Sequence, residues 1–210
     1  MIIKPTDTIL FTGDSITDRG RKRDAALNDP LALGVGYVRL LSERIRTELQ
    51  SPELTIINCG MSGNRIYDIE DRIESDLLAF KPTVVSILAG INDTWRRYDS
   101  NIISETGAFQ ASYRRILERV RDELGARIII LEPFLLPVGK DRRTWREDID
   151  PKITAIRELA AEFAVAYIPF DGIFAAACCQ SPAEHWLPDG VHPSPAGNAL
   201  MADMWMAAVK

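Results

Sequence analysis

The sequence predicts an α/β fold in which helices cover both faces of one central, mostly parallel sheet. Two observations support this prediction. Short, continuously apolar segments alternate with longer segments whose apolar residues recur at helical spacing, and this alternation is typical of parallel strands joined by crossover helices. The 210 residues also contain no repeat, low-complexity tract or linker. We therefore expect a single three-layer α/β/α domain over residues 1–210, with about five strands in its sheet.

Short apolar runs predict the strands. They are rich in isoleucine, leucine, valine and threonine, and such side chains favour the pleated, buried surface of a sheet. Glycine or proline follows several of the runs, as expected where a strand gives way to a turn. The predicted strands are residues 8–12, 54–59, 83–89, 127–131 and 166–168.

Longer amphipathic segments predict the helices between these strands. The segment 36–49 carries Val38, Leu41 and Ile45 at helical spacing, with charged residues between them. Pro151 is expected in the first turn of its helix, where proline is tolerated because the first N–H groups have no intrahelical acceptor. The predicted helices are residues 36–49, 66–78, 109–124, 148–164 and 195–209, with a long loop at 133–143.

The charge and the apolar content exclude several classes of partner. A net charge of −5 and a pI near 5.2 argue against nucleic acid and against an anionic membrane surface, since both attract basic patches. No run approaches the roughly 20 apolar residues of a membrane span. The first seven residues are too polar for a signal peptide. We therefore expect a cytoplasmic protein with neither a nucleic acid nor a membrane as its partner.

The three cysteines favour neither a disulfide framework nor a metal site. Cys178 and Cys179 are adjacent, Cys59 stands alone, and no C-x-x-C pair occurs. Buried, unreactive thiols are the expected state of such free cysteines. The sequence therefore predicts no cofactor and no metal.

Polar clusters follow the first three predicted strands. Residues 13–15 follow the first strand, residues 60–64 the second and residues 90–93 the third. In a doubly wound α/β sheet, ligands bind outside the carboxyl ends of the strands. The three clusters therefore predict a site at one edge of the sheet.

Each cluster also has a purely structural interpretation. Asp14 or Ser15 could cap the segment that follows. Asn92 and Asp93 could form an Asx turn, and Gly63 could be a turn residue that needs a positive φ. No single cluster therefore establishes a function.

A histidine near the end of the sequence provides the strongest chemical signal, because the chain has only two. His192 follows Asp189 by three residues. A carboxylate at that spacing can turn back onto the imidazole Nδ1 and leave Nε2 free to accept a proton. The other histidine, His185, has no aspartate at this spacing and is interpreted as structural or peripheral. With Ser15 on a tight turn after the first strand, the pair predicts a serine hydrolase.

Four polar segments are distributed over nearly the whole chain: Gly13-Asp14-Ser15, Met61-Ser62-Gly63-Asn64, Gly90-Ile91-Asn92-Asp93 and Asp189-Gly190-Val191-His192-Pro193. In this order they resemble the four blocks of the SGNH (GDSL-type) hydrolases. The resemblance implies a flavodoxin-like fold, Ser15 as nucleophile, His192 as base and Asp189 as the residue that orients the base. It also implies an oxyanion hole formed by the backbone N–H groups of Ser15 and Gly63 and the side-chain amide of Asn92.

Longer stretches resemble the bacterial acetyl xylan esterase branch: residues 13–18, 36–38, 87–99 and 191–197. That resemblance implies removal of acetyl groups from xylo-oligosaccharides, so the expected partner is a small acyl ester or an acetylated oligosaccharide. Trp95 and Trp186 are predicted to wall the substrate pocket, unless they are ordinary packing residues, and Asp14 is a further candidate for substrate binding. Arg96 and Arg97 are expected to be solvated surface.

Other functions stay open on the sequence alone. An esterase, lipase or thioesterase for other short acyl chains would need the same residues. A metal-dependent phosphoesterase could use the carboxylates at the strand ends, but a two-metal site usually needs several histidines and only His185 is spare. A non-catalytic carbohydrate-binding protein would have no reason to keep the serine, the histidine and their partners. The dinucleotide, P-loop and G-x-S-x-G motifs are absent. Homo-oligomerisation is left open.

Overall fold

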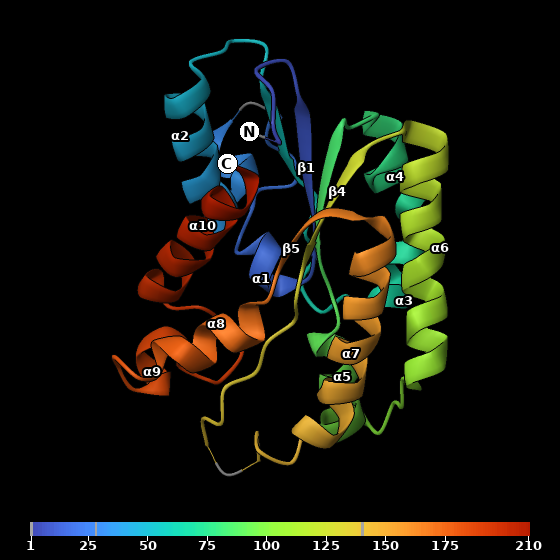
Figure 1. Ribbon diagram of the computed structural model, residues 1–210, viewed down its shortest axis with the longest axis vertical. Helices are drawn as coiled ribbons and strands as arrows, with labels where there is room; N and C mark the ends of the chain where they lie inside the picture. Colours follow the sequence, from blue (N-terminus) through green and yellow to red (C-terminus); the bar gives the residue numbers. More distant parts are fainter. Residues whose placement is uncertain (1, 28, 140) are drawn as a thin grey trace.

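The computed structural model describes residues 2–27, 29–139 and 141–210. At its centre is a five-stranded sheet with the order β2-β1-β3-β4-β5, in which all neighbouring strands are parallel (Figure 1). The predicted α/β fold is thereby confirmed. The strands are β1 (Thr8–Gly13), β2 (Thr55–Asn58), β3 (Val84–Leu88), β4 (Arg127–Leu131) and β5 (Ala164–Ile168).

Helices of different lengths connect the strands and follow the last of them. The longer helices are α2 (Tyr37–Leu49), α5 (Ile91–Ser100), α6 (Thr106–Leu124), α7 (Arg146–Phe163), α8 (Phe170–Ala177) and α10 (Pro195–Val209). The shorter ones are α1 (Ser15–Asp18), α3 (Ile66–Asp71), α4 (Ile73–Asp76), α9 (Ala183–Trp186) and the 3₁₀ turns η1 (Pro30–Leu33) and η2 (Leu78–Phe80). Among the described residues, no helix is long and apolar enough to cross a membrane.

The helices form a layer on each face of the sheet. On one face α10 packs against α2, and on the other α6 packs against α3 and α7 (Figure 1). Side chains of β1 alternate between the two layers, because successive residues of a strand point to opposite faces. Phe11 joins the core beneath α10, where its ring lies 5.6 Å from that of Trp205, whereas Leu10 joins the core beneath α3 and α6.

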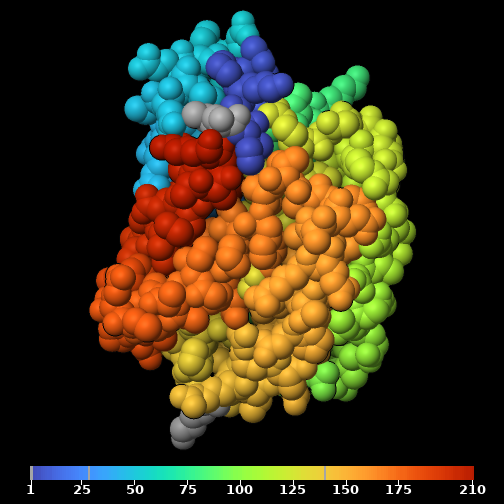
Figure 2. Space-filling view, in the orientation of Figure 1, coloured from blue at the N-terminus to red at the C-terminus, as the bar shows by residue number. Residues whose placement is uncertain are grey.

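The two ends of the chain lie close together beside α10 (Figure 1). The Ile2 N–H donates to the Val209 carbonyl at 2.6 Å, so the last helix is joined to the segment that leads into β1. In the space-filling view, the carboxyl-terminal part of the chain, in orange and red, covers much of the face toward the viewer (Figure 2).

The order of the strands produces a crevice between β1 and β3. From β1 the chain crosses to β2 on one side, whereas β3, β4 and β5 follow one another on the other side. The connections that leave β1 and β3 therefore diverge at the carboxyl ends of these strands, where open α/β sheets bind ligands. Gly13 and Leu88 are register partners at these two ends, so the two connections start side by side.

Several helices differ from the predicted boundaries. The predicted helix 66–78 is interrupted at Arg72, whose guanidinium donates to Asn64 Oδ1 at 2.7 Å and to Asp76 at 3.0 Å. The placement of Pro151 in a first turn was wrong, because α7 begins at Arg146 and the proline lies inside the helix. The sequence reasoning missed α5 and α8 altogether.

Candidate active site

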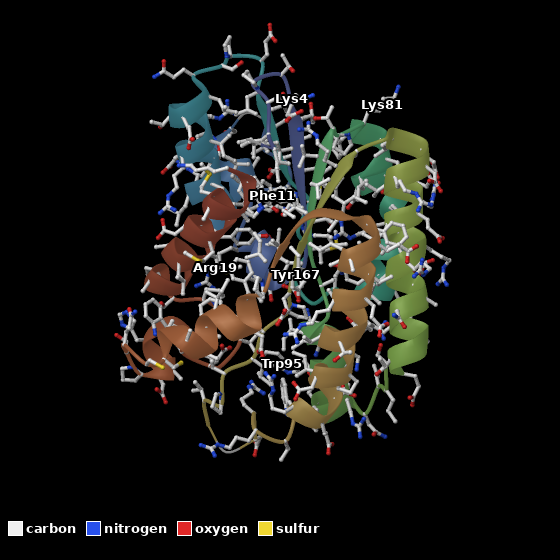
Figure 3. The ribbon with its side chains drawn as sticks, viewed as in Figure 1. Lys4, Phe11, Arg19, Lys81, Trp95 and Tyr167 are labelled. Carbon is white, nitrogen blue, oxygen red and sulfur yellow. The ribbon has the colours of Figure 1, made fainter. Side chains whose placement is uncertain are left out.

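The sheet brings the sequence-distant polar segments to one edge. Figure 3 shows Lys4 and Lys81 toward one end of the molecule and Trp95 toward the opposite end, with Arg19 also on that side of Phe11. That second end is the carboxyl edge, because Arg19 follows β1 and Trp95 follows β3. The site predicted from the order of the segments is therefore built there by the fold.

A tight connection after β1 places Ser15 at this edge. A Cβ atom at Gly13 would lie 2.4 Å from the Leu88 carbonyl oxygen, so only glycine fits between the two strand ends. Asp14 then caps α1, because its Oδ1 accepts the Ile16 N–H at 2.9 Å. Ser15 is thus the first residue of a helix.

Ser15, His192 and Asp189 form a continuous hydrogen-bonded chain. Ser15 Oγ lies 2.9 Å from His192 Nε2, and His192 Nδ1 lies 2.6 Å from Asp189 Oδ2. The other carboxylate oxygen of Asp189 accepts the N–H groups of Val191 and His192 at 2.9 and 2.7 Å. The aspartate is therefore fixed within its own turn, with one oxygen left for the imidazole. This is the geometry that a hydroxyl nucleophile, its base and an orienting carboxylate require.

The two carboxylates beside this chain have opposite pKa shifts. Partial burial works against ionisation of Asp189, but the hydrogen bonds from His192 and Val191 outweigh it and hold the Asp189 pKa well below its usual value. Burial raises the pKa of Asp14 to about 6, against the backbone N–H of Ile16 and the nearby His192, which lower it. Asp189 therefore stays ionised over the whole neutral range, as an acceptor for the imidazole N–H must.

The backbone N–H groups of Ser15 and Gly63 donate to no other group within the described part of the chain. Gly63 has a φ of 87°, a conformation that favours glycine. Asn92 donates one amide hydrogen to the Asn64 carbonyl at 3.1 Å, which leaves the second hydrogen available. Ser15, Gly63, Asn92 and His192 line the same hollow, so it contains donors suited to a developing negative charge.

Asn92 and Asp93 lie in the first turn of α5 rather than in an isolated Asx turn. Asp93 is buried and accepts the Ile66 N–H at 3.0 Å and the Ser104 hydroxyl at 3.2 Å. Burial raises its pKa to about 7, although these hydrogen bonds lower it. Asp93 therefore joins the start of α5 to the start of α3.

The two tryptophans lie in different environments. The ring of Trp95 lies 5.8 Å from the His192 ring and lines the hollow beside Ser15. Trp186 donates its indole N–H to the Ala177 carbonyl at 3.1 Å and does not line either hollow beside Ser15. The structure thus brings Trp95, and not Trp186, to the predicted site.

Asp14 lies beneath the surface of the site. Its side chain is fully buried, with one oxygen in the α1 cap, and it lines neither hollow beside Ser15. Asp14 is adjacent to Ser15 in the sequence, but the sequence spacing does not show whether its side chain is buried. His185 stacks edge-on against Trp186, and its carbonyl accepts the Ser194 hydroxyl, consistent with a peripheral position.

Sequence reasoning missed two residues of the hollow. Arg96 and Asp99 line it beside Trp95 and pair with each other, although Arg96 was expected to be ordinary solvated surface. The missing signal was the helix itself: once residues 91–100 are helical, positions 92, 95, 96 and 99 share one face. On the other side of Ser15, a second hollow is lined by Arg19, Gly20, Val35 and Ser62.

Within residues 2–27, 29–139 and 141–210, no group of three histidines, cysteines or carboxylates is arranged to hold a metal ion. The acidic residues that a phosphoesterase would use have other partners. Asp18 accepts the backbone N–H and the hydroxyl of Ser62 at 3.0 and 2.7 Å, and Asp93 holds Ile66 and Ser104. These carboxylates therefore brace the loops and do not converge on one point.

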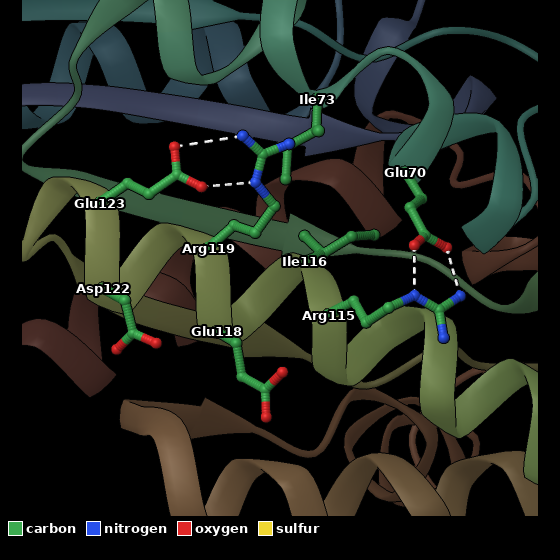
Figure 4. Close-up of a pocket in the computed structure, with 8 residues that line it drawn as sticks. All are labelled: Glu70, Ile73, Arg115, Ile116, Glu118, Arg119, Asp122 and Glu123. Atoms are coloured by element: carbon green, nitrogen blue, oxygen red, sulfur yellow. Dashed lines mark hydrogen bonds and ion pairs between the residues drawn. The ribbon is translucent and has the colours of Figure 1, made fainter.

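A separate hollow lies on the outer surface between α6 and the α3–α4 segment (Figure 4). Arg115 pairs with Glu70 and Arg119 with Glu123, each at 2.5 Å. Its lining contains no serine, cysteine or histidine. Because its charges are largely paired and it has no nucleophile, we interpret it as a surface groove.

Comparison with known proteins agrees with the site geometry. Residues 11–200 match the model of the GDSL-like lipase/acylhydrolase family. An acetylxylan esterase from Geobacillus stearothermophilus is 31% identical, over 100% of this chain and 96% of that protein. A putative GDSL-like lipase from Parabacteroides merdae superposes with a TM-score of 0.92 at 37% identity, over 99% of this chain and 97% of the other. A solved acetyl xylan esterase from Geobacillus stearothermophilus superposes with a TM-score of 0.91 at 30% identity, over 100% and 97%. The chain belongs to the GDSL-like lipase/acylhydrolase family and is a carboxylic ester hydrolase.

Proposed function

We propose that the protein is a serine esterase that removes acetyl groups from carbohydrate esters, with xylo-oligosaccharides as the main substrates. The observation that carries the catalytic part is the hydrogen-bonded chain from Ser15 through His192 to Asp189, at the edge of a hollow that also contains Gly63 and Asn92. A nucleophile, its base and neutral donors for an oxyanion are together sufficient for acyl transfer.

Relatives support both the residues and the substrate. One similar structure is a variant of an acetyl-xylooligosaccharide esterase from Geobacillus stearothermophilus. Three others are catalytic mutants of that acetylxylan esterase, in which a serine, a histidine and an aspartate are replaced by alanine. There the aspartate precedes the histidine by three residues, the same spacing as Asp189 and His192.

Acylation begins when His192 Nε2 takes the proton of the Ser15 hydroxyl. The oxygen attacks the acetyl carbonyl carbon, and the resulting negative charge lies on the former carbonyl oxygen. The N–H groups of Ser15 and Gly63 and the amide of Asn92 stabilise that charge. The imidazolium, held by Asp189, then protonates the departing sugar oxygen and leaves an acetyl ester on Ser15.

Deacylation repeats these steps with water as the nucleophile. His192 takes a proton from the water, the hydroxide attacks the acetyl-serine, and acetate leaves as Ser15 recovers its proton from the imidazolium. Asp189 is suited to both halves because its pKa is held low, so it stays an acceptor while the charge on the imidazole changes.

Release of acetate from acetylated xylobiose tests the substrate, and a series of p-nitrophenyl esters tests the acyl group. We expect release of acetate, with kcat/KM falling from acetyl to butyryl to octanoyl. An apolar pocket discriminates by about 1–3 kcal/mol per methylene, so the fall should be steep but not absolute. A rise toward octanoyl with no acetate from the sugar would support a lipase or thioesterase instead.

The variant Ser15→Ala tests the nucleophile. Its rate on both substrates should fall by about 10³-fold or more, since the remaining site can still bind and polarise an ester. Ser181→Ala, a serine outside the hollows beside Ser15, is the control and should keep the wild-type rate. A purified Ser15→Ala protein with more than a tenth of the wild-type kcat would exclude Ser15 as nucleophile.

A further inference from the structure

Helix α5 presents one face to the hollow beside Ser15. Asn92, Trp95, Arg96 and Asp99 have the i, i+3, i+4, i+7 spacing of a single helical face, and all four line this hollow. Arg97, the neighbour of Arg96 in sequence, points to α7 and donates to a carboxylate there at 3.0 Å. The hollow is therefore bordered by a specific row of side chains and not by the helix in general.

These four residues follow one another along the axis of α5. Asn92 stands in the first turn of α5, beside the donors that would hold the ester carbonyl. A helix rises about 1.5 Å per residue, so the Cα atoms of Arg96 and Asp99 lie about 6 and 10 Å further along the axis. The Arg96 side chain reaches back toward Gly63, where Nη2 lies 3.8 Å from a built Cβ atom, and it also pairs with Asp99. An acetyl group whose carbonyl is at Asn92 is too small to reach Asp99, so the Arg96–Asp99 pair lies where the alcohol part of the ester can contact it.

We propose that Trp95, Arg96 and Asp99 form the sugar-binding subsite of the esterase, with the pyranose against Trp95 and its free hydroxyls on the Arg96–Asp99 pair. This inference rests on the proposed function and adds to it the residues that select the alcohol.

The charges of the pair indicate the class of ligand. Arg96 and Asp99 form an ion pair, and about a third of each side chain is exposed, at 32% and 34%. The guanidinium has N–H donors left over and the carboxylate has lone pairs left over, so together they can donate to one hydroxyl and accept from the next. Because the two charges balance, the subsite favours a neutral polyol over an anionic leaving group such as a thiol that carries phosphates.

The tryptophan is held in place for this role. Its ring packs edge-on against Trp145 at 5.2 Å, and the Arg142 guanidinium lies 4.4 Å from its centroid. Arg142 also donates to the Asp189 carbonyl at 3.1 Å. A ring fixed in this way offers a rigid apolar wall, and little side-chain entropy is lost when a ligand packs against it.

The experiment compares kcat/KM for acetylated xylobiose with kcat/KM for p-nitrophenyl acetate in the same preparations. The variants are Arg96→Met and Asp99→Asn. The control is Arg39→Met, because Arg39 is similarly exposed (35%) and also belongs to an ion pair within one helix, α2. Thermal unfolding by circular dichroism verifies that each variant is folded.

For Arg96→Met and Asp99→Asn we expect the ratio of sugar to p-nitrophenyl kcat/KM to fall by about tenfold or more, mainly through KM, as for a lost hydrogen bond to a charged group. Xylobiose should also inhibit p-nitrophenyl acetate hydrolysis less in both variants than in the wild type. The control should keep the wild-type ratio.

Wild-type kcat/KM on both substrates in both variants would overturn the subsite and favour the hollow of Gly20 and Val35 for the sugar. An equal loss on both substrates would also overturn it, since the pair would then support the oxyanion donors. A wild-type protein that cleaves p-nitrophenyl acetate but releases no acetate from the sugar would overturn the proposed function together with the subsite. Sugar deacetylation with an unaltered ratio would overturn only the subsite.

Discussion

At the residue scale, the candidate site depends on a few atoms whose hydrogen bonds are already made. His192 is fixed from both sides, by Ser15 at 2.9 Å and by Asp189 at 2.6 Å. The proposed oxyanion donors, by contrast, are not occupied by acceptors within the described part of the chain, apart from one hydrogen of Asn92. This combination is electrostatic preorganisation. The imidazole is held in place, and the N–H donors remain free to bind a developing negative charge.

Replacement of the orienting carboxylate should affect the transition state more than binding. In Asp189→Asn we expect kcat to fall by about 10³- to 10⁴-fold with little change in KM, because the amide favours the wrong imidazole tautomer and cannot stabilise the imidazolium. Steady-state kinetics on p-nitrophenyl acetate measures both constants. Asp203→Asn, an exposed carboxylate paired with Arg44, is the matched control. A variant whose loss lies mainly in KM would contradict this role.

Removal of the side-chain donor should have a smaller effect. In Asn92→Ala we expect kcat to fall by about 10²-fold, the scale for one oxyanion-hole donor. Asn92→Asp keeps the size of the side chain but replaces a neutral donor with a negative acceptor, so its kcat should be lower still. If the aspartate variant is the more active of the two, Asn92 does not face the developing charge.

The residues of the site that were predictable are those in short, dense motifs. Ser15, Asp189 and His192 could be named because one of only two histidines follows an aspartate by three residues and the serine stands on a turn after the first predicted strand. Arg96 and Asp99 could not, since their place in the hollow depends on a helix that the pattern did not reveal. Spacing also failed to show that Asp14 is buried.

At the scale of elements, the turn that carries the base is held by the loop between β4 and α7. The Leu136 N–H donates to the Gly190 carbonyl at 2.9 Å, and Arg142 donates to the neighbouring Asp189 carbonyl. Gly190 has a φ of 85°, and a Cβ atom there would lie 2.5 Å from the Leu136 carbonyl oxygen. The Asp189–His192 turn and this loop can therefore approach only through a glycine.

Gly190→Ala should displace this turn and lower both activity and stability. A positive φ costs an alanine roughly 1–2 kcal/mol, and the contact with the carbonyl adds to that cost. Urea unfolding and kcat for p-nitrophenyl acetate measure the two effects. Gly172→Ala is the control, because Gly172 lies in α8 with no atom near a built Cβ, and alanine should stabilise a helix by about 0.5–1 kcal/mol. Wild-type kcat in Gly190→Ala would show that the close approach is not needed.

The strands and the four longest helices were predictable, whereas α5, α8 and the shorter elements were not. The apolar runs located all five strands because a sheet buried on both faces needs continuous apolar sequence. Helix α5 escaped because it is only 10 residues long and mostly polar, with Ile91, Trp95 and Tyr98 as its only large apolar residues. The break between α3 and α4 depends on hydrogen bonds from Arg72 to Asn64 and Asp76, which no local pattern contains.

At the scale of the whole molecule, buried carboxylates should make stability depend on pH. Burial raises the pKa of Asp93 to about 7 and that of Asp14 to about 6, above the ordinary aspartate value of 3.8. At pH values between 3.8 and the raised pKa of each group, the folded state binds more protons than the unfolded state. The free energy of unfolding therefore decreases as pH rises through this range. One such group contributes at most about 1.4 kcal/mol per pH unit. The pKa of Asp189 is lowered in the folded state, so this residue makes the free energy of unfolding increase as pH rises. It does so only at pH values below its pKa in the unfolded chain.

The variant Asp93→Asn tests this dependence. An asparagine resembles the protonated acid and can still accept the Ile66 N–H, so the decrease in unfolding free energy from pH 5 to 7 should be smaller than in the wild type. Urea unfolding at both pH values measures the difference, and Asp203→Asn is again the control. Equal decreases in Asp93→Asn and the wild type would show that Asp93 is ionised throughout this range.

The distance along the chain between the proposed nucleophile and its proposed base has a consequence for biosynthesis. Ser15 and His192 are 177 residues apart, and ribosomes add about 5–20 residues per second. The serine is therefore made roughly 9–35 seconds before the histidine that deprotonates it in the proposed mechanism. Under this mechanism a nascent chain carries the serine hydroxyl without its base for almost the whole of its synthesis, and ester hydrolysis can begin only once translation has passed the last loop of the fold.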